Sequence, residues 1–526
     1  MVGHRIRWIL TVLIPAVTLS GVRAQAPGKP LPFDSRIMAA RIDQYMAARW
    51  QEKKAVPAPI ADDAEFFRRL SLDITGRIPS ITLLQDFLSD KRPDKRQIWL
   101  EVLFNLEDES VRFKPRPTHY VNHFSTYWRT VIFAQTTNQQ AQFIGFQLDP
   151  LLRRHVQDNV SFDRMVRDIL TTPQGTAFFQ ASEGKPENIA GAASRLFLGV
   201  KLECAQCHND KSGGSWTREQ FWEFAAFFQG FGGGNRGVPV AQPGVTVSAP
   251  KIKIPDKNIT VEARFLDGRT PAFDRNQTAV AVLAEWMTAP DNPYFARAAV
   301  NRMWYYFLGT GLTDPVDHMA TEDNPPSHPE LLDEMAAQFV ANGFDLKWLI
   351  RSITGSKAYQ LSSRKTDDSQ DDERLFARMA VRGMSPEQLF DSLGEATGYR
   401  DTSPAQPNRG FGVPQGTRAE FLAKFTNTTD KRTEMQTSIL QALFLMNGGT
   451  LNNSVKSSKA LKTVQDNTKS PIAKNIEELY LITLSRKPQP HELDRLVRYV
   501  EARERAEALA DVFWALLNSS EFALNH

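Results

Sequence analysis

The sequence predicts a mainly α-helical protein, in which a Gly/Pro-rich connector with a few short β-strands joins two helical domains. The chain has 526 residues, 41% of them hydrophobic, and a single hydrophobic core seldom grows beyond roughly 250–300 residues. Apolar side chains recur at helical spacing in both halves of the chain. Residues 231–276, between these halves, are rich in glycine and proline and contain short alternating runs.

Residues 1–24 have the pattern of a secretory signal peptide. Arg5 and Arg7 give a positive start, residues 8–19 form an apolar stretch that is short for a membrane span, and residues 22–24 form a small-residue cleavage site. We therefore expect a mature chain that begins near Gln25 and is periplasmic or secreted. An uncleaved N-terminal anchor is the alternative.

Charge and hydropathy exclude several classes of partner. The signal peptide holds three basic residues and no acidic one, so that 60 of the 63 basic residues remain beside 60 acidic residues. No basic block with interleaved aromatic residues occurs, and nucleic acid is therefore not expected as a partner. We expect no membrane span after removal of the signal peptide, because no second apolar run is long enough.

The first helical domain is expected over residues 27–230. Its first clear helix starts behind the capping candidates Asp62 and Asp63 and ends at Gly76, and a second helix begins at Ser80. Further helices are expected over residues 95–105, 118–134, 143–159, 161–171, 187–198 and 217–228.

The connector is expected over residues 231–276, with short strands at 245–247 and 252–254. Its G-x-G-x-x-G match at residues 232–237 lacks the preceding strand and following helix that a dinucleotide site requires, so we assign no such site.

The second helical domain is expected over residues 277–526. One of its helices should have Pro293 in the first turn. Another should start at Ser327, because the run Ser-His-Pro-Glu over residues 327–330 fits a capping box with the serine at the N-cap. The pattern Arg-x-Pro at residues 486–488 repeats that at residues 77–79, which predicts two helical hairpins with the same turn chemistry.

The strong chemical signature is the run Cys204-Ala205-Gln206-Cys207-His208. Its two-residue gap puts both thiols on one side of a turn, where they can form thioethers to the two vinyl groups of a haem, with His208 as an axial ligand. The chain has two cysteines in all, so they cannot belong to a larger disulfide framework. We predict haem c at this box. A zinc site, a redox disulfide and an inert pair are the alternatives.

A second group facing the iron should come from elsewhere in the chain. The pair His119-x-x-x-His123 is the best candidate, because residues four apart share a helix face, and His123 is preferred. The predicted metal ligands are therefore His208 and His123. His318 and His328 stand near acidic residues, which we interpret as a solvated loop before a capped helix. Whether the protein is an enzyme stays open, because no hydrolase elbow, zincin or Walker pattern occurs.

Several segments resemble the planctomycete-type cytochrome-like (PSCyt) domain and its usual companion, the PSD domain. The PSCyt-like segments are residues 62–69, 72–79, 194–200 and 204–208, and the PSD-like segments are residues 289–297, 300–304, 324–333 and 514–522. The resemblance implies an exported protein built from two domains of unknown function. In similar proteins a His-Pro-Phe-Asp segment usually follows the box, whereas Asn209 follows it here. His123 with Phe124 matches a histidine–aromatic pair in similar sequences, which favours His123 as the distal group.

Together these observations predict an exported c-type haem-binding protein that acts in electron transfer or envelope-associated oxidative chemistry, with an envelope redox partner. The alternative is a non-catalytic envelope or polysaccharide-associated binding protein whose box is structural. Its contact candidates would be Trp216, Trp222, Trp304 and Trp348. The sequence does not predict the substrate or the oligomeric state.

We expect signal peptidase to cleave after Ala24, because the small residues at its exit follow the apolar stretch. Exported protein should therefore give an N-terminal sequence that starts at Gln25. A start at Met1 would contradict the prediction and favour the anchor.

Overall fold

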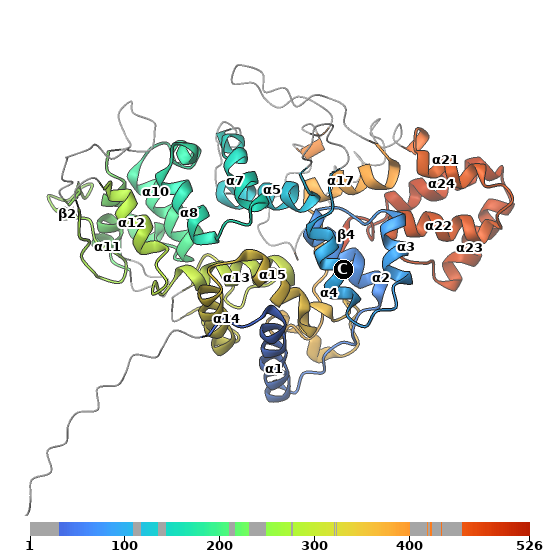
Figure 1. The fold of residues 1–526 in the computed structure, drawn as a ribbon, viewed down its shortest axis with the longest axis horizontal. Coiled ribbons are helices and arrows are strands. Elements are labelled where there is room, and N and C mark those ends of the chain that lie inside the picture. Colours follow the sequence, from blue (N-terminus) through green and yellow to red (C-terminus); the bar gives the residue numbers. More distant parts are fainter. Residues whose placement is uncertain are drawn as a thin grey trace, which may run out of the picture.

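The computed structural model describes residues 31–108, 117–134, 144–209, 216–230, 249–274, 277–319, 321, 323–399, 418, 421–422, 433 and 455–526. Over these ranges the protein consists mainly of helices, with two short antiparallel two-stranded sheets, which confirms the predicted fold class (Figure 1). No helix in these ranges is long and apolar enough to cross a membrane. The signal peptide, residues 245–247 and residues 232–237 lie outside the described residues.

The first half of the chain forms the helices that surround the Cys-x-x-Cys-His box and those that connect it to the rest of the body. They are α1 (Ser35–Lys53), α2 (Asp63–Thr75), α3 (Ile81–Ser89), α4 (Lys95–Phe104), α5 (His119–Phe133), α7 (Asp149–Gln157), α8 (Phe162–Thr171), α9 (Thr176–Ala181), α10 (Pro186–Ala193) and α11 (Arg218–Ala225). The predicted caps of α2 and α3 are confirmed. Asp62 and Ser80 accept hydrogen bonds from backbone N–H groups of the first turns, and α2 ends at Gly76 in the left-handed conformation.

Helix α1 is absent from the elements expected from the sequence. Its buried residues Met38, Ile42, Met46 and Trp50 recur at every fourth position and leave a narrow apolar stripe among polar residues. Because the stripe is narrow, the sequence shows only a weak amphipathic pattern here. The stripe nevertheless packs against the buried side of α15 (Leu346–Gly355).

The second half forms α12 (Ala279–Met287), α13 (Phe295–Leu308), α14 (Pro329–Ala341), α15, α16 (Lys357–Gln360), α17 (Pro386–Thr397), α21 (Lys459–Asp466), α22 (Ile472–Leu484), α23 (Pro490–Glu501) and α24 (Arg505–Leu517). Helix α22 ends at Ser485 with φ 58°, much as α2 ends at Gly76 with φ 73°. Each turn leads into a second helix, which confirms the two related hairpins.

Two predicted helix starts in the second half are wrong. Pro293 precedes the N-cap Tyr294 of α13 and so lies outside the first turn. At α14 the N-cap is His328, which makes no side-chain cap bond, whereas Ser327 was expected there. The hydroxyl of Ser327 instead lies 3.0 Å from His328 Nδ1, and its N–H donates to the carbonyl of Leu312 at 2.7 Å. This long-range backbone bond holds Ser327 outside the helix.

The described part of the predicted connector, residues 249–274, folds onto the helical body. Strand β1 (Lys251–Lys253) confirms the strand expected at 252–254 to within one residue, and it pairs with β2 (Thr260–Glu262). The ring of Phe265 stacks on Phe227 and on Trp286, with centroid distances of 5.3 and 4.9 Å. Apolar burial therefore holds this stretch in place.

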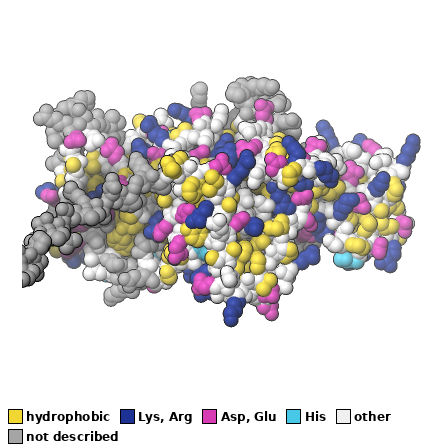
Figure 2. All heavy atoms as spheres, turned by 60° about the horizontal axis from the view of Figure 1, so that its bottom comes forward, with side chains coloured by type: hydrophobic (Ala, Val, Ile, Leu, Met, Phe, Trp, Pro, Cys, Tyr) yellow, Lys and Arg dark blue, Asp and Glu magenta, His cyan; other side chains and the backbone are white. Residues whose placement is uncertain are grey.

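The hydrophobic residues form two clusters that are divided differently from the two expected domains. The larger cluster runs from Met38 to Met379 and thus includes helices on both sides of the connector. The smaller one consists of buried residues between Met384 and Phe522, together with Leu72 and Ile78. Its helices α21–α24 lie at one end of the molecule (Figure 1). On the outside, Figure 2 shows basic and acidic side chains mixed across one face, as expected from their nearly equal numbers.

A buried ion pair joins the two halves. The carboxylate of Asp73 on α2 accepts hydrogen bonds from Arg382 Nη1 and Nη2 at 3.1 and 2.9 Å, from the Tyr359 hydroxyl at 2.9 Å and from Asn525 Nδ2 at 2.8 Å. Asp73, Arg382 and Asn525 are fully buried. Burial alone would lower the pKa of Arg382, but the charge and hydrogen bonds of Asp73, with Tyr359 and Tyr306 nearby, together raise that pKa. Four donors thus compensate one buried carboxylate.

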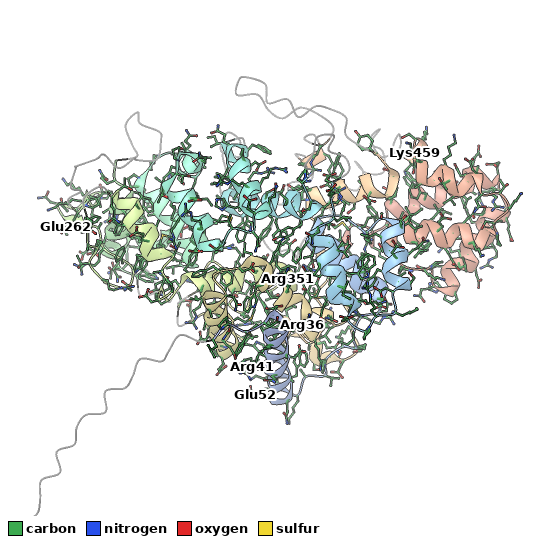
Figure 3. The ribbon with its side chains drawn as sticks, in the orientation of Figure 1. Arg36, Arg41, Glu52, Glu262, Arg351 and Lys459 are labelled. Atoms are coloured by element: carbon green, nitrogen blue, oxygen red, sulfur yellow. The ribbon has the colours of Figure 1, made fainter. Side chains whose placement is uncertain are left out.

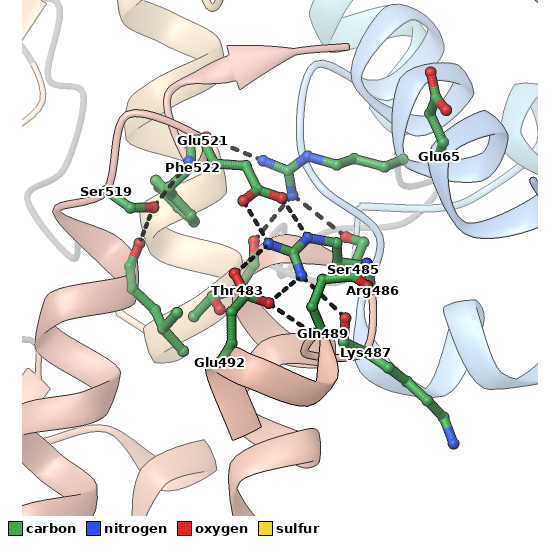
Figure 4. A network of polar contacts seen from close by, with 12 residues as sticks. Glu65, Thr483, Ser485, Arg486, Lys487, Gln489, Glu492, Ser519, Glu521 and Phe522 are labelled. Carbon is green, nitrogen blue, oxygen red and sulfur yellow. Dashed lines mark hydrogen bonds and ion pairs between the residues drawn. The ribbon is translucent and has the colours of Figure 1, made fainter. Parts of the chain in front are cut away.

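Strands and neighbouring arginines extend this junction. Arg382 belongs to β3 (Arg382–Gly383), which pairs antiparallel with β4 (Leu524–Asn525) near the end of the chain. Arg68, also on α2, donates to the carbonyls of Thr483 and Phe522 at 2.9 and 3.0 Å, and its burial lowers its pKa to about 10. Beside it, Arg486 pairs with both Glu492 and Glu521 (Figure 4). Helix α2 therefore anchors the C-terminal helices.

We expect Asp73→Ala to reduce the free energy of unfolding by about 3–5 kcal/mol, because it leaves the Arg382 guanidinium buried without its counter-charge. Chemical denaturation followed by circular dichroism measures the loss. Glu52→Ala is the matched control, because Glu52 pairs with Arg49 on the exposed end of α1 and its loss should change little (Figure 3). Equal effects of the two variants would contradict a central role for Asp73.

Candidate functional site

The helix before the box ends in a turn that is fastened to the second half of the chain. Helix α10 continues as a π-helical turn over Ser194–Leu198 and stops at Gly199 with φ 65°. A Cβ at Gly199 would lie 2.8 Å from Met319 Sδ, and the N–H of Met319 donates to the Gly199 carbonyl at 2.8 Å. Both the conformation and the space thus require glycine here.

The box itself lies on a 3₁₀ turn over Glu203–Gln206 and the residues that follow it. Leu202 and Ala205 are buried, Cys204 is half-buried, and Cys207 and His208 are exposed. The apolar residues therefore hold the turn against the core while the chemically active side chains face outward. Both cysteines are free thiols.

The imidazole of His208 has a defined partner. Its Nδ1 lies 2.8 Å from the carbonyl oxygen of Asn209. Since a carbonyl only accepts hydrogen bonds, Nδ1 must carry the proton in this contact, and Nε2 keeps the lone pair in the neutral ring. Nε2 is then the nitrogen available to a metal.

Helix α11 holds the box from the following side. Thr217 and Gln220 form the capping box at its N-terminus, which confirms the helix expected over residues 217–228. Trp222 Nε1 and Arg218 Nε both donate to the Gln206 carbonyl, at 3.2 and 3.1 Å. The N–H of Arg218 also donates to Asn209 Oδ1 at 3.0 Å. Helix α11 therefore holds the backbone before Cys207 and the side chain of the residue that follows the box.

Charged groups lie behind the box, between the two halves of the chain. Glu203 lies 3.4 Å from Arg195 Nε, and burial raises the pKa of its carboxyl group. Arg302 on α13 pairs with Asp317 and approaches the carbonyls of Arg195 and Leu196 at 3.5 and 3.4 Å. The second half thus supplies a cation to the end of the π-helical turn.

The residues of the box fit covalent haem. Both thiols of the Cys-x-x-Cys spacing have access to the outside, and the adjacent imidazole offers Nε2. Haem would be held by Cys204, Cys207 and His208. For the zinc alternative, no group of three His, Cys, Asp or Glu side chains suited to a metal ion occurs among the described residues.

His123, the predicted distal ligand, has other partners. Its Nε2 lies 2.6 Å from the Tyr306 hydroxyl, which donates to the Asp73 carbonyl at 2.8 Å. Because that bond uses the hydroxyl proton, His123 Nε2 is the donor to Tyr306. Its Nδ1 faces Gly76, where a Cβ would lie 2.4 Å away. Nε2 is thus bonded to Tyr306 and the ring packs against Gly76, at the junction between the halves.

The contacts of His123 and those of the turn that leads to the box lie at different points along α13. Ala298 on α13 lies beside Gly199, which leads to the box, whereas Tyr306 lies eight residues farther along the same helix. At 1.5 Å per residue this spacing is about 12 Å. The contacts of His123 include Tyr306 on α13 and the neighbouring ring of Phe124.

Comparisons with known families bear on both halves. Residues 41–232 match PSCyt2, a protein of unknown function (DUF1549), and residues 281–425 match PSD1, a protein of unknown function (DUF1553). The chain thus carries a match to PSCyt2 followed by a match to PSD1, in the order that the resemblance predicted. This confirms the resemblance described above. No curated protein and no solved structure matches the chain. The PSCyt2 domain holds Asp73 and the box, and the PSD1 domain holds Tyr306 and Arg382.

The remaining candidates from the sequence are mostly part of the core. Trp222, Trp304 and Trp348 are buried, so they are not available as contacts for a polysaccharide, and Trp216 is half-buried. His119 is buried with its Nδ1 3.9 Å from Asp108. His328 was expected in a solvated loop but is 4% exposed, which corrects that interpretation. The PSD1 domain packs it beside Phe376.

Stability should fall in acid because of His328. Burial, helped by Arg49 and Arg374, lowers its pKa to about 4. In the unfolded chain the histidine has a pKa of about 6.5 and takes up the proton first, so the folded state loses stability as the pH falls from about 6.5 to about 4. His328→Gln should reduce the difference in unfolding free energy between pH 7 and pH 5 by up to about 2 kcal/mol in urea denaturation.

The matched control for this prediction is His491→Gln, at an exposed position on α23. It should leave the pH dependence close to that of the wild type. If His328→Gln behaves like the control, other groups cause the acid sensitivity.

Proposed function

We propose that this protein is an exported c-type haem-binding protein whose PSCyt2 domain attaches haem through Cys204 and Cys207, with His208 as the proximal ligand. The observation that supports the proposal is the outward-facing Cys207–His208 pair on a turn held from both sides, with Nε2 of the imidazole available. When bound, haem supplies one-electron redox chemistry.

The setting of the box favours electron exchange with an envelope partner. Leu202 and Ala205 anchor the turn in the core, while Cys207 and His208 are exposed to solvent. A redox group attached there would lie where another protein can approach it closely. The mixed charge of the face shown in Figure 2 and the nearly equal numbers of basic and acidic residues give no preference for a strongly acidic or strongly basic partner.

A role for His123 as second ligand would require a rearrangement. To bind iron through Nε2, His123 would have to give up its hydrogen bond to Tyr306. We therefore propose that, in the arrangement seen here, the side of the iron opposite His208 is open or takes a group other than His123. An open position would favour small-molecule chemistry over simple electron transfer.

The test is production of the full chain together with a c-type cytochrome maturation system. The wild-type protein should show a pyridine haemochrome spectrum and keep its haem through acid–acetone extraction, because thioether bonds resist it. Cys204→Ser with Cys207→Ser should abolish the covalent haem. His208→Ala should keep attachment but alter the Soret band and spin state, because the axial imidazole sets the ligand field.

His491→Ala is the control for the histidine variant, since His491 is exposed on the distant helix α23. It should leave the spectrum unchanged. Properly matured wild-type protein that contains zinc or no haem would overturn the proposal and favour a binding protein with a structural box.

A further inference from the structure

Asn209 and Arg218, which follow the box in the sequence, connect His208 to helix α11. The Asn209 carbonyl accepts from His208 Nδ1 at 2.8 Å, and the Asn209 side-chain Oδ1 accepts from the backbone N–H of Arg218 at 3.0 Å. Asn209 therefore satisfies a free N–H in the first turn of α11 and orients the imidazole at the same time. One residue thus relates His208 to a rigid helix.

The side chain of Arg218 completes this connection. Its Nε donates to the Gln206 carbonyl at 3.1 Å, directly before Cys207, and its Nη2 donates to the Pro255 carbonyl at 2.8 Å. Pro255 belongs to the turn between β1 and β2. The planar guanidinium therefore joins three segments: the box, α11 and the strand pair. A lysine has one charged nitrogen and cannot make both contacts in this geometry.

We infer that Asn209 and Arg218 are positioning residues that select the Nδ1–H tautomer of His208 and present its Nε2 outward. The inference rests on the proposed function for its purpose, because Nε2 is the nitrogen that would ligate iron. The partner of the other ring nitrogen sets both the tautomer and the orientation of a ligating histidine. The neutral histidine side chain in water favours the Nε2–H form, so an exposed His208 needs such a partner to keep Nε2 free.

The decisive experiment uses the haem-free full chain, so that it does not depend on haem binding. Protein labelled with ¹⁵N-histidine is studied by NMR at a pH where His208 is neutral, and His208→Gln assigns its signals. In the wild type the ring-nitrogen shifts should report mainly the Nδ1–H tautomer. Asn209→Ala should shift the population toward the Nε2–H form, whereas Asn209→Asp, which keeps the acceptor for the Arg218 N–H, should restore the wild-type tautomer.

The role of Arg218 is tested in the same haem-free chain, by the reactivity of Cys207. Arg218→Ala and Arg218→Lys should both loosen the turn and increase the rate at which Cys207 reacts with iodoacetamide, a neutral reagent, severalfold. Arg264→Ala is the matched control, because Arg264 lies 3.7 Å from Glu223 on the same helix and makes no described contact with the box. It should leave both the rate and the tautomer unchanged.

The outcomes separate this inference from the proposed function. An Asn209→Ala tautomer equal to that of the wild type, or a Cys207 rate unchanged in both Arg218 variants, overturns the positioning role even if haem is attached. A tautomer shift in protein that never acquires haem supports the positioning role and refutes the haem proposal. In haem-loaded protein, Asn209→Ala should also shift the midpoint potential, with recovery in Asn209→Asp.

Discussion

The buried ion pair between Asp73 and Arg382 constrains the arrangement of the whole molecule. A buried carboxylate is tolerated only when its charge and lone pairs are fully compensated, and here the donors come from α16, β3 and β4. These segments are separated from Asp73 by hundreds of residues. The carboxylate of Asp73 therefore finds its hydrogen-bond donors only when both halves of the chain are in place. The pair therefore specifies one packing of the PSCyt2 domain on the PSD1 domain.

Helix α13 transmits this constraint to the box. Near its C-terminal end, Tyr306 donates to the Asp73 carbonyl, and its own carbonyl accepts from Arg382 at 2.8 Å. Farther back along the helix, Arg302 approaches the end of the π-helical turn and Ala298 lies beside Gly199. Because a helix is stiff over this length, the loop that leads to Cys204 has a defined position relative to the ion pair. The segment around Asp73 and the box are thus connected through α13.

Local signals were readable from the sequence, whereas contacts between distant segments were not. Asp62, Ser80 and Thr217 cap helices through their own side chains, so a few neighbouring residues suffice to predict them. Ser327 fits a cap equally well, but a bond to Leu312 holds it outside α14. The spacing of His119 and His123 correctly predicted that both lie on α5. It could not predict that Tyr306, which is distant in the sequence, is the partner of His123. Asn209 differs from the residue that usually follows the box in similar sequences, and its contact with Arg218 could not be read from that difference.

The PSD1 domain has a direct part in the candidate site. The five residues of the box all lie within the PSCyt2 match. In the structure Met319 packs on Gly199, and Arg302 with Asp317 lies behind the turn that precedes the box. A glycine that accepts no side chain and a cation directed at helix carbonyls leave this turn little freedom. An isolated PSCyt2 segment would lack these contacts, and its box would lose the support that holds Cys204 beside α11. In this chain the second domain therefore completes the support of the turn that precedes the box.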